Sequence, residues 1–253
     1  MREKFSKSAL FASVFLILST EHISHDAQML MDPKSAMCYM LKKAREDKKE
    51  MLMFFACNQK ACLFVKSKTR GKTYTIKINQ NEMAKAFAYL QSVLKGDHIN
   101  YGFAHTHPNY TAKKAILVHF NCHKNTNGKV CTKLKRRLSN TKYLSIPPSV
   151  IDLNTQLYLV SSYGMPFSSI VVDPYYAWLV YFKPDPYLAV SPDEYALTQD
   201  SYKKYERRIG ELLASALKNS KNLAPNVANY LNDAISRLSL HIEQIRVDAL
   251  CKK

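Results

Sequence analysis

The sequence predicts a mixed α/β fold in which a sheet is flanked by helices. Segments of strand length alternate with segments whose apolar residues recur at helical spacing. Two of the strand-length segments are almost continuously apolar, which is typical of inner strands buried on both faces. The chain has 253 residues, of which 47% are hydrophobic, and this is enough to form a core for such a domain.

The first expected element is a helix over residues 33–48. Asp32 can cap it and Pro33 suits its first position, because proline lacks only an amide that has no partner there. Three strands should follow, and then a helix over 82–95 that ends at Gly96. The three strands are expected at 51–56, 61–66 and 72–78.

A fourth strand, 100–105, leads into His105-Thr106-His107. Alternate residues of an extended chain point the same way, so the two imidazoles could bind one ion. Such a pair can also be two ordinary hydrogen-bonded histidines. A catalytic zinc site uses three protein ligands, commonly histidine nitrogen and carboxylate oxygen, and leaves one position to water. Asp152 is the natural third ligand.

The two halves of this site also carry a resemblance. Phe103-Ala104-His105-Thr106-His107-Pro108, followed by Pro148-Ser149-Val150-Ile151-Asp152-Leu153, resembles the signature of the JAMM (MPN+) zinc metallopeptidases. In that family His-[Ser/Thr]-His-Pro precedes Ser-x-x-Asp, and the order of helix, three strands, helix and strand is also the same. The resemblance covers residues 33–183.

The resemblance implies a JAMM/MPN-like (cytidine-deaminase-like) mixed sheet, and Zn²⁺ bound by the two histidines and Asp152. It implies hydrolysis of a peptide or isopeptide bond through a zinc-activated water, with Glu50 at the start of the first strand as general base. Glu46 is the alternative base, and Glu50 could also be a solvated residue at the helix end. The family's serine, here Ser149, stabilises the oxyanion, although capping a helix would explain this residue equally well.

The chain departs from the family in the length of the segment between the two halves, where residues 108–148 replace a far shorter spacer. An insertion that loops out costs little free energy when its ends stay in place. Residues 109–144 contain nine Lys and Arg and no Asp or Glu, and the whole chain has a net charge of +17. Because the insertion leaves and re-enters between ligands, we expect it near the cleft. The residues predicted to bind substrate there are Lys133, Lys135, Arg136 and Arg137.

The expected partner is a peptide or protein substrate, with acidic proteins, ubiquitin-like proteins and cell-wall peptides as candidates. Two non-enzymatic alternatives stay open: a binding module of the same fold, and a basic nucleic-acid-binding protein. The insertion also contains metal-ligand residue types, which could form a second zinc site or, for the cysteines, a disulfide. These residues are His119, Cys122, His123 and Cys131.

Residues 1–27 are expected to be an export signal, because Arg2, Lys4 and Lys7 precede an apolar run over 9–18 that is too short to span a bilayer. An uncleaved membrane anchor and a buried first helix are the alternatives. Six cysteines permit up to three disulfides in an exported chain. The locally plausible pairs are Cys57 with Cys62 and Cys122 with Cys131, and an ordinary buried thiol is the simple interpretation of Cys38.

A third helix is expected to begin at Ser149, and strands at 157–162, 168–172 and 176–182 would complete the sheet. The metallopeptidase-like domain is thus expected over 28–183. Proline-rich turns then mark a boundary. Two long helices, 193–219 and 225–250, are expected to form a C-terminal helical hairpin extension over 193–253.

Overall fold

The computed structural model describes residues 30–71, 78–96, 99–123, 128–163, 167–182, 199–219, 227–235 and 240–251. The strands of this part are β1 (Leu30–Met31), β2 (Met51–Cys57), β3 (Cys62–Arg70), β4 (Asn100–Thr106), β5 (Phe167–Val172), β6 (Tyr176–Phe182) and β7 (Leu240–Arg246). They form a seven-stranded sheet in the order β1-β3-β2-β4-β5-β6-β7. The β4–β5 pair is parallel and the other neighbours are antiparallel.

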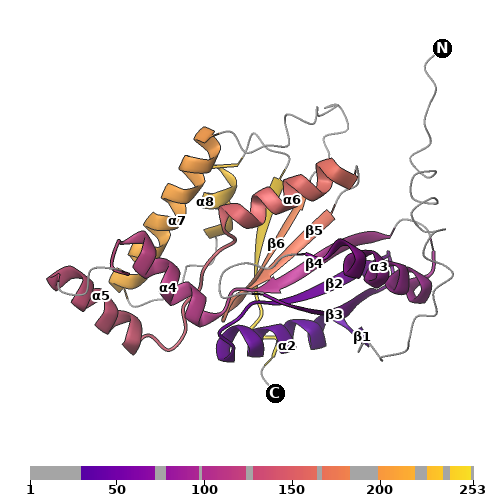
Figure 1. Cartoon of the computed structure of the whole chain (residues 1–253), viewed down its shortest axis with the longest axis horizontal. Coiled ribbons are helices and arrows are strands. Elements are labelled where there is room, and N and C mark those ends of the chain that lie inside the picture. Colours follow the sequence, from indigo (N-terminus) through magenta and orange to yellow (C-terminus); the bar gives the residue numbers. More distant parts are fainter. Residues whose placement is uncertain are drawn as a thin grey trace, which may run out of the picture.

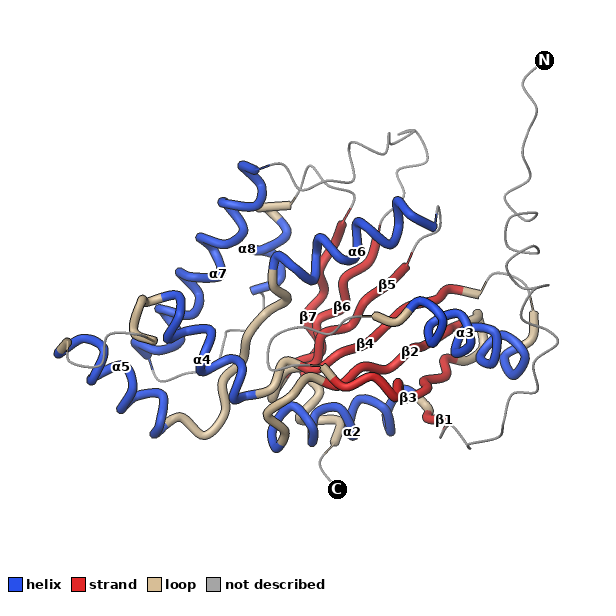
Figure 2. Tube along the Cα trace, viewed as in Figure 1, coloured by secondary structure: helices blue, strands red, loops and turns tan. Residues whose placement is uncertain are grey.

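Helices flank this sheet (Figure 1). They are α2 (Pro33–Glu46), α3 (Gln80–Leu94), α4 (Asn109–His119), α5 (Lys129–Asn140), α6 (Val150–Tyr163), α7 (Gln199–Asn219) and α8 (Val227–Asn232). The helices α3 and α6 cover one face of the sheet and α2 covers the other, as Figure 2 shows. The predicted mixed α/β class, a sheet flanked by helices, is confirmed.

The first helix begins as its sequence predicts. The carboxylate of Asp32 accepts a hydrogen bond from the Ser35 amide at 3.0 Å and another from its hydroxyl at 2.6 Å, and Pro33 is the first helical residue. The strands predicted at 51–56, 61–66 and 100–105 correspond to β2, β3 and β4. The predicted helix 82–95 corresponds to α3, which starts two residues earlier because Asn79 caps it. Of the strand predicted at 72–78, residues 72–77 lie outside the described part of the chain.

β2 is buried on both faces, as its apolar sequence predicts. Leu52 and Phe54 belong to the core beneath α3, whereas Met53 and Phe55 belong to the core beneath α2. Successive side chains of a strand point to opposite faces, so one apolar run serves both cores. This arrangement makes β2 a rigid neighbour for β4, with which it pairs directly.

The strand predicted at 157–162 is wrong, because these residues continue α6 to Tyr163. The apolar residues Leu153 and Leu157 are four apart and pack together against β6 and α7, which is a helical pattern. The strands predicted at 168–172 and 176–182 correspond to β5 and β6. The predicted boundary after residue 182 lies outside the described residues.

The predicted C-terminal helical hairpin is also wrong in its second half. The helix expected over 225–250 is replaced by the short helix α8 and by β7, which pairs with β6 along its whole length. Leu240 and Ile242 alternate toward the core beneath α7 and α8, and Val247 joins the core on the opposite face. The C-terminal segment is therefore part of the same sheet. The first predicted helix of the hairpin, 193–219, corresponds to α7, and residues 193–198 of that prediction lie outside the described part of the chain.

Three disulfides link the cysteines: Cys38–Cys251, Cys57–Cys62 and Cys122–Cys131. The two local pairs match the prediction. The interpretation of Cys38 as a free buried thiol is wrong, since it bonds to Cys251 across 213 residues of sequence. This bond links α2, near the start of the described chain, to the segment just beyond β7 at its end.

Within the described residues, no helix is long and apolar enough to cross a membrane. The predicted export signal, residues 1–27, and the alternative anchor at 9–18 lie outside the described part of the chain.

Candidate metal centre

The histidine pair lies where β4 ends. His105 is paired with Leu52 of β2 on one side and with Val171 of β5 on the other. The backbone amide of His107, just beyond the strand, still donates to the Val172 carbonyl at 2.8 Å. Both side chains are buried. The sheet therefore fixes the two imidazoles side by side, as strand alternation predicts.

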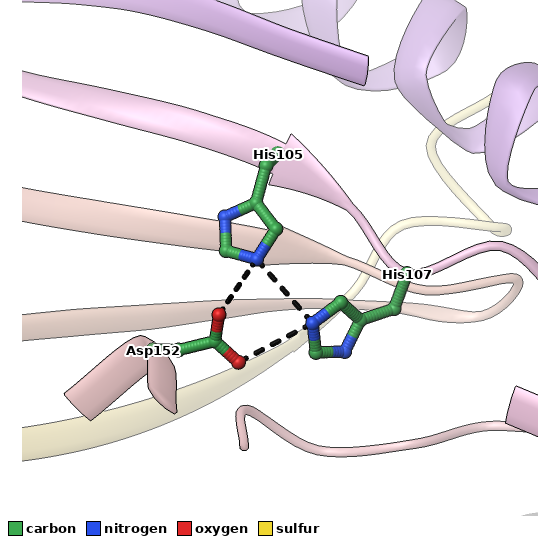
Figure 3. A group of neighbouring side chains, drawn as sticks. All are labelled: His105, His107 and Asp152. Atoms are coloured by element: carbon green, nitrogen blue, oxygen red, sulfur yellow. Dashed lines mark hydrogen bonds and ion pairs between the residues drawn. The ribbon is translucent and has the colours of Figure 1, made fainter. Parts of the chain in front are cut away.

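Asp152 comes from the first turn of α6. Its carboxylate accepts hydrogen bonds from the Ser149 amide at 2.5 Å and from the Ser149 hydroxyl at 2.7 Å. In return the Asp152 amide donates to the Ser149 hydroxyl oxygen at 3.3 Å. This is a reciprocal capping box, in which the N-cap and the third helical residue satisfy each other's amides. The cap holds the Asp152 carboxylate at the start of the helix, facing the histidines (Figure 3).

The three side chains converge on one point. The Nε2 atom of His105 lies 2.9 Å from one Asp152 oxygen, the Nε2 atom of His107 lies 3.3 Å from the other, and the two Nε2 atoms are 3.3 Å apart (Figure 3). One donor atom from each residue lies within 4.8 Å of the others. Two imidazoles and a carboxylate are a ligand set that zinc and other first-row divalent metals accept. The group fits a metal ion with an open fourth position.

A cavity of about 70 Å³ adjoins these donors. This is several times the roughly 10 to 15 Å³ that a cavity needs in order to hold one water molecule, so water could reach the ion's open position. The lining residues are Glu50, Leu52, Ile78, Phe103, His105, His107, Ser149, Ile151, Asp152 and Thr155.

Electrostatics couple the three donors in the metal-free protein. Burial alone would lower the pKa of His107, but the Asp152 charge and its hydrogen bond raise that pKa to about 9. Burial would raise the pKa of Asp152, but the two histidines hold it well below its usual range. In the metal-free protein, protonated His107 and ionised Asp152 therefore form a buried ion pair. A metal ion would replace the proton, because it needs neutral imidazole.

Glu50 lies just before β2 and is only 7% exposed. Its carbonyl accepts a hydrogen bond from the Gly71 amide at 3.1 Å, and the next amide, of Met51, donates to the Thr106 hydroxyl at 2.9 Å. Thr106, the residue between the histidines, thus ties the start of β2 to the ligand strand. Burial raises the pKa of Glu50, whereas the histidines oppose that shift. The predicted base lines the same cavity as the predicted ligands, whereas Glu46 is exposed and does not.

Comparison with protein-family models, curated proteins and solved structures found no match. The chain's own residues therefore carry the argument for its function.

The insertion is folded. Its helices α4 and α5 are joined by the Cys122–Cys131 disulfide and share a small core with Leu213 of α7. The disulfide uses both thiols, so the alternative of a second zinc bound by these cysteines is not supported. The Asn109 amide donates to the Lys142 carbonyl at 2.9 Å and accepts from the Leu144 amide at 2.9 Å. This single side chain clamps the two ends of the insertion together.

The basic residues predicted to bind substrate are not brought to the cavity. They lie on α5, which projects away from the sheet at the far end of the molecule in Figure 1, and none lines the cavity. The two ends of the insertion lie near the site. The prediction that its basic residues also line the cavity is not supported. These residues are Lys133, Lys135, Arg136 and Arg137.

Sequence reasoning missed three residues that support the site. Thr106 is one of them, and its position between the two histidines could have indicated a supporting role from the sequence alone. Asp173 and Tyr205 are the others, both fully buried and distant in sequence from the ligands. Asp173 lies between the strands predicted at 168–172 and 176–182 and precedes a proline, which indicates only a turn. Tyr205 had no signal, because it lies in a helix assigned to a separate extension.

Proposed function

We propose that this protein is a zinc-dependent metallopeptidase of the JAMM type that hydrolyses a peptide or isopeptide bond. The observation that carries the proposal is the meeting of His105, His107, Asp152 and Glu50 at one cavity. These residues come from three separate segments, and residues 108–148 lie between the last two. Side chains of this kind, buried together beside a cavity, are a common basis of catalysis.

We propose further that the mixed sheet is a JAMM/MPN-like domain. The order of α2, β2, β3, α3 and β4 before the histidine pair supports this assignment, as does the start of α6 at the Ser-x-x-Asp segment. β7 and the disulfide to α2 make the C-terminal segment part of this domain.

Zinc, when bound, would polarise a substrate carbonyl and lower the pKa of water to about 7. The protein's own contribution begins with the three ligands, which the sheet and the α6 cap hold in place. Glu50 accepts the proton of the attacking water and passes it to the leaving nitrogen. Its burial beside the ligands places it where a group that takes and returns a proton must lie. In the metal-free protein burial raises the pKa of Glu50. A bound cation would lower that pKa again.

Ser149 has two roles in this proposal. Its hydroxyl now donates to the Asp152 carboxylate, and so it orients a ligand. Because Ser149 also lines the cavity, its hydroxyl could turn to donate to the oxygen on which charge develops as the carbonyl is attacked.

The test of this proposal is Glu50→Gln, an almost isosteric change that removes the base. Zinc content and melting temperature should stay close to wild type, whereas peptidase activity should fall by about 100- to 10,000-fold. Glu46→Gln is the matched control, because Glu46 is the exposed glutamate at the end of α2 and should leave activity unchanged. A Glu50→Gln protein as active as wild type would refute the assignment of the base. A zinc-loaded wild type that cleaves no peptide or isopeptide would favour a binding module instead.

We also propose that the protein is exported. The three disulfides support this, because such bonds persist mainly in oxidising compartments. Protein recovered from its native compartment without reductant should show no free thiol among the six cysteines by alkylation and mass spectrometry. Six alkylated thiols would contradict export.

A further inference from the structure

The return segment, residues 145–149, leads from the insertion to the Asp152 turn and is held by hydrogen bonds from two other parts of the chain. The buried carboxylate of Asp173 accepts a hydrogen bond from the Ser145 hydroxyl at 2.5 Å and from the Ile146 amide at 3.2 Å. The same carboxylate accepts from the Trp178 indole at 2.8 Å and from the amides of Tyr175 and Tyr176. Asp173 therefore joins the return segment to the turn between β5 and β6.

A second anchor comes from α7. The hydroxyl of Tyr205 donates to the Pro148 carbonyl at 2.9 Å, and the tyrosine is fully buried. Its ring packs in the same core as Val150 and Leu153 of α6. Burial and the nearby Asp152 charge raise the pKa of Tyr205 well above its usual range, so the hydroxyl keeps its proton and donates at all ordinary pH values.

The position of this contact connects it to the metal ligand. Pro148 immediately precedes Ser149, whose amide and hydroxyl direct the Asp152 carboxylate. The Pro147-Pro148 pair is conformationally restricted, because each proline fixes its own φ and the residue before it is restricted too. A shift of the Pro148 carbonyl would therefore move the Ser149 amide, and with it the oxygens of Asp152.

We propose that Tyr205 is a positioning residue of the metal centre, which fixes the Ser149–Asp152 turn through the Pro148 carbonyl. The inference rests on the proposed metal site and extends it to α7, which lies outside the segment that carries the metallopeptidase signature. The two histidines of the metal centre are held by the sheet. The Ser149–Asp152 turn is held in position against them by α7, through Tyr205. The helix after the signature is then a component of the site.

Tyr205→Phe tests this proposal, since it removes one hydroxyl and keeps the ring in its core. Zinc affinity is measured by competition with a chromophoric chelator, and the visible absorption of the Co²⁺-loaded protein reports the geometry of the bound metal. Outer partners that orient metal ligands typically contribute about 10- to 100-fold in metal affinity. We expect Tyr205→Phe to weaken zinc binding by about tenfold and to alter the Co²⁺ spectrum.

Tyr202→Phe is the matched control. Tyr202 lies one helical turn earlier on α7, is partly buried against the same core, and hydrogen-bonds Glu206 instead of the site. It should lose no zinc affinity and keep the wild-type Co²⁺ spectrum, even if its melting temperature falls as much as that of Tyr205→Phe. A merely structural role of Tyr205 would lower the melting temperature alone.

The outcomes separate this inference from the proposed function. If the wild type binds zinc and Tyr205→Phe matches it in affinity and Co²⁺ spectrum, the positioning role is wrong and the metal centre stands. If the wild type binds neither Zn²⁺ nor Co²⁺, the metal centre itself is wrong and the positioning role is overturned with it.

Discussion

The end of β4 and the first turn of α6 supply ligands to the same site in different ways. β4 carries His105 on an inner strand that is paired on both sides, and His107 follows just beyond its end, where its amide still donates to the Val172 carbonyl. The α6 turn packs against the sheet only through side chains such as Val150 and Leu153. Asp152 is aimed by hydrogen bonds from Ser149 and by the anchors of the return segment. One half of the site is thus built from regular secondary structure, and the other from a cap and distant side chains.

This difference explains how the chain tolerates the insertion between its ligands. The insertion begins two residues after His107, beyond the end of β4, so it interrupts no strand pairing of β4. Hydrogen bonds of the Asn109 side chain hold the two ends of the insertion together. Asp173 and Tyr205 then hold the return segment in succession. The loop-closure cost of the insertion is small, and its ends are set by specific side chains.

The largest expected effects come from removing one ligand of each half. His107→Ala and Asp152→Ala should each weaken zinc binding by more than the roughly 10- to 100-fold typical of losing an outer partner of a ligand. Asp152→Ala should also lower the melting temperature of the metal-free protein, because it removes both the buried ion pair with His107 and the carboxylate that caps α6. Isothermal titration with zinc and thermal unfolding in chelator measure the two effects. Unchanged zinc affinity in Asp152→Ala would remove α6 from the site.

Ser149→Ala separates the two roles of the cap residue. Losing an N-cap costs about 1 kcal/mol of stability, and losing an oxyanion donor lowers kcat by about 100- to 1,000-fold. We expect both effects in the zinc-loaded protein, with the zinc affinity reduced less than in Asp152→Ala. Denaturant unfolding and peptidase kinetics give the two values. A stability loss with full activity would restrict Ser149 to capping.

The pH dependence of stability tests the coupling between the two halves. The pKa of His107 is raised to about 9 in the metal-free fold from an ordinary value of 6.5, since the Asp152 charge and hydrogen bond, with the Glu50 charge, outweigh the effect of burial. The resulting stabilisation is fully present below pH 6.5 and is lost as the pH rises through about 9. Zinc affinity should change in the opposite direction, because binding releases that proton.

Melting temperatures in chelator and in excess zinc, taken at pH 6.5 and pH 9.5, measure both trends. Without metal the protein should melt lower at pH 9.5, and His107→Ala should lack this component of the decline. With zinc in excess, the stabilisation over the metal-free protein should be larger at pH 9.5. A metal-free melting temperature that rises over this range would contradict the ion pair.

The smallest expected effect comes from the basic helix α5. Reversing its four predicted substrate-binding residues to glutamate should leave hydrolysis of a small neutral peptide unchanged, because none of them lines the cavity. Association with an acidic protein substrate should slow, and the wild-type rate should fall as salt rises. The reversed residues are Lys133, Lys135, Arg136 and Arg137.

Four exposed lysines elsewhere provide a control for net charge: Lys42, Lys60, Lys85 and Lys203. Reversing them should slow association less. Equal slowing by both sets would show that net charge acts alone, and salt-sensitive binding to DNA or RNA that only the α5 reversal abolishes would favour the nucleic-acid alternative.

The sequence was sufficient for features set by local spacing. Strand alternation predicted the histidine pair, the Asp32-Pro33 pair predicted the start of α2, and short spacing predicted two of the disulfides. Features that depend on partners distant in sequence were missed or misassigned. Cys38–Cys251 spans 213 residues, and no local pattern indicates such a pairing.

The misassigned strand β7 has a similar cause. Leu238, Ile242 and Ile245 fit a helical stripe, but Leu240 and Ile242 also fit the alternation of a strand, and pairing with β6 decides between the two. The contact of Tyr205 with Pro148 depends on how α7 packs, which spacing within either segment does not encode.

The metal content of the purified protein tests the central claim most directly. Elemental analysis of wild type loaded with zinc and then dialysed should find about one zinc ion per chain, as three protein ligands and one open position require. The double variant His105→Ala/His107→Ala, prepared in the same way, should contain none while keeping its fold. Full zinc occupancy in the double variant, or none in the wild type, would contradict a metal centre at the junction of β4 and α6.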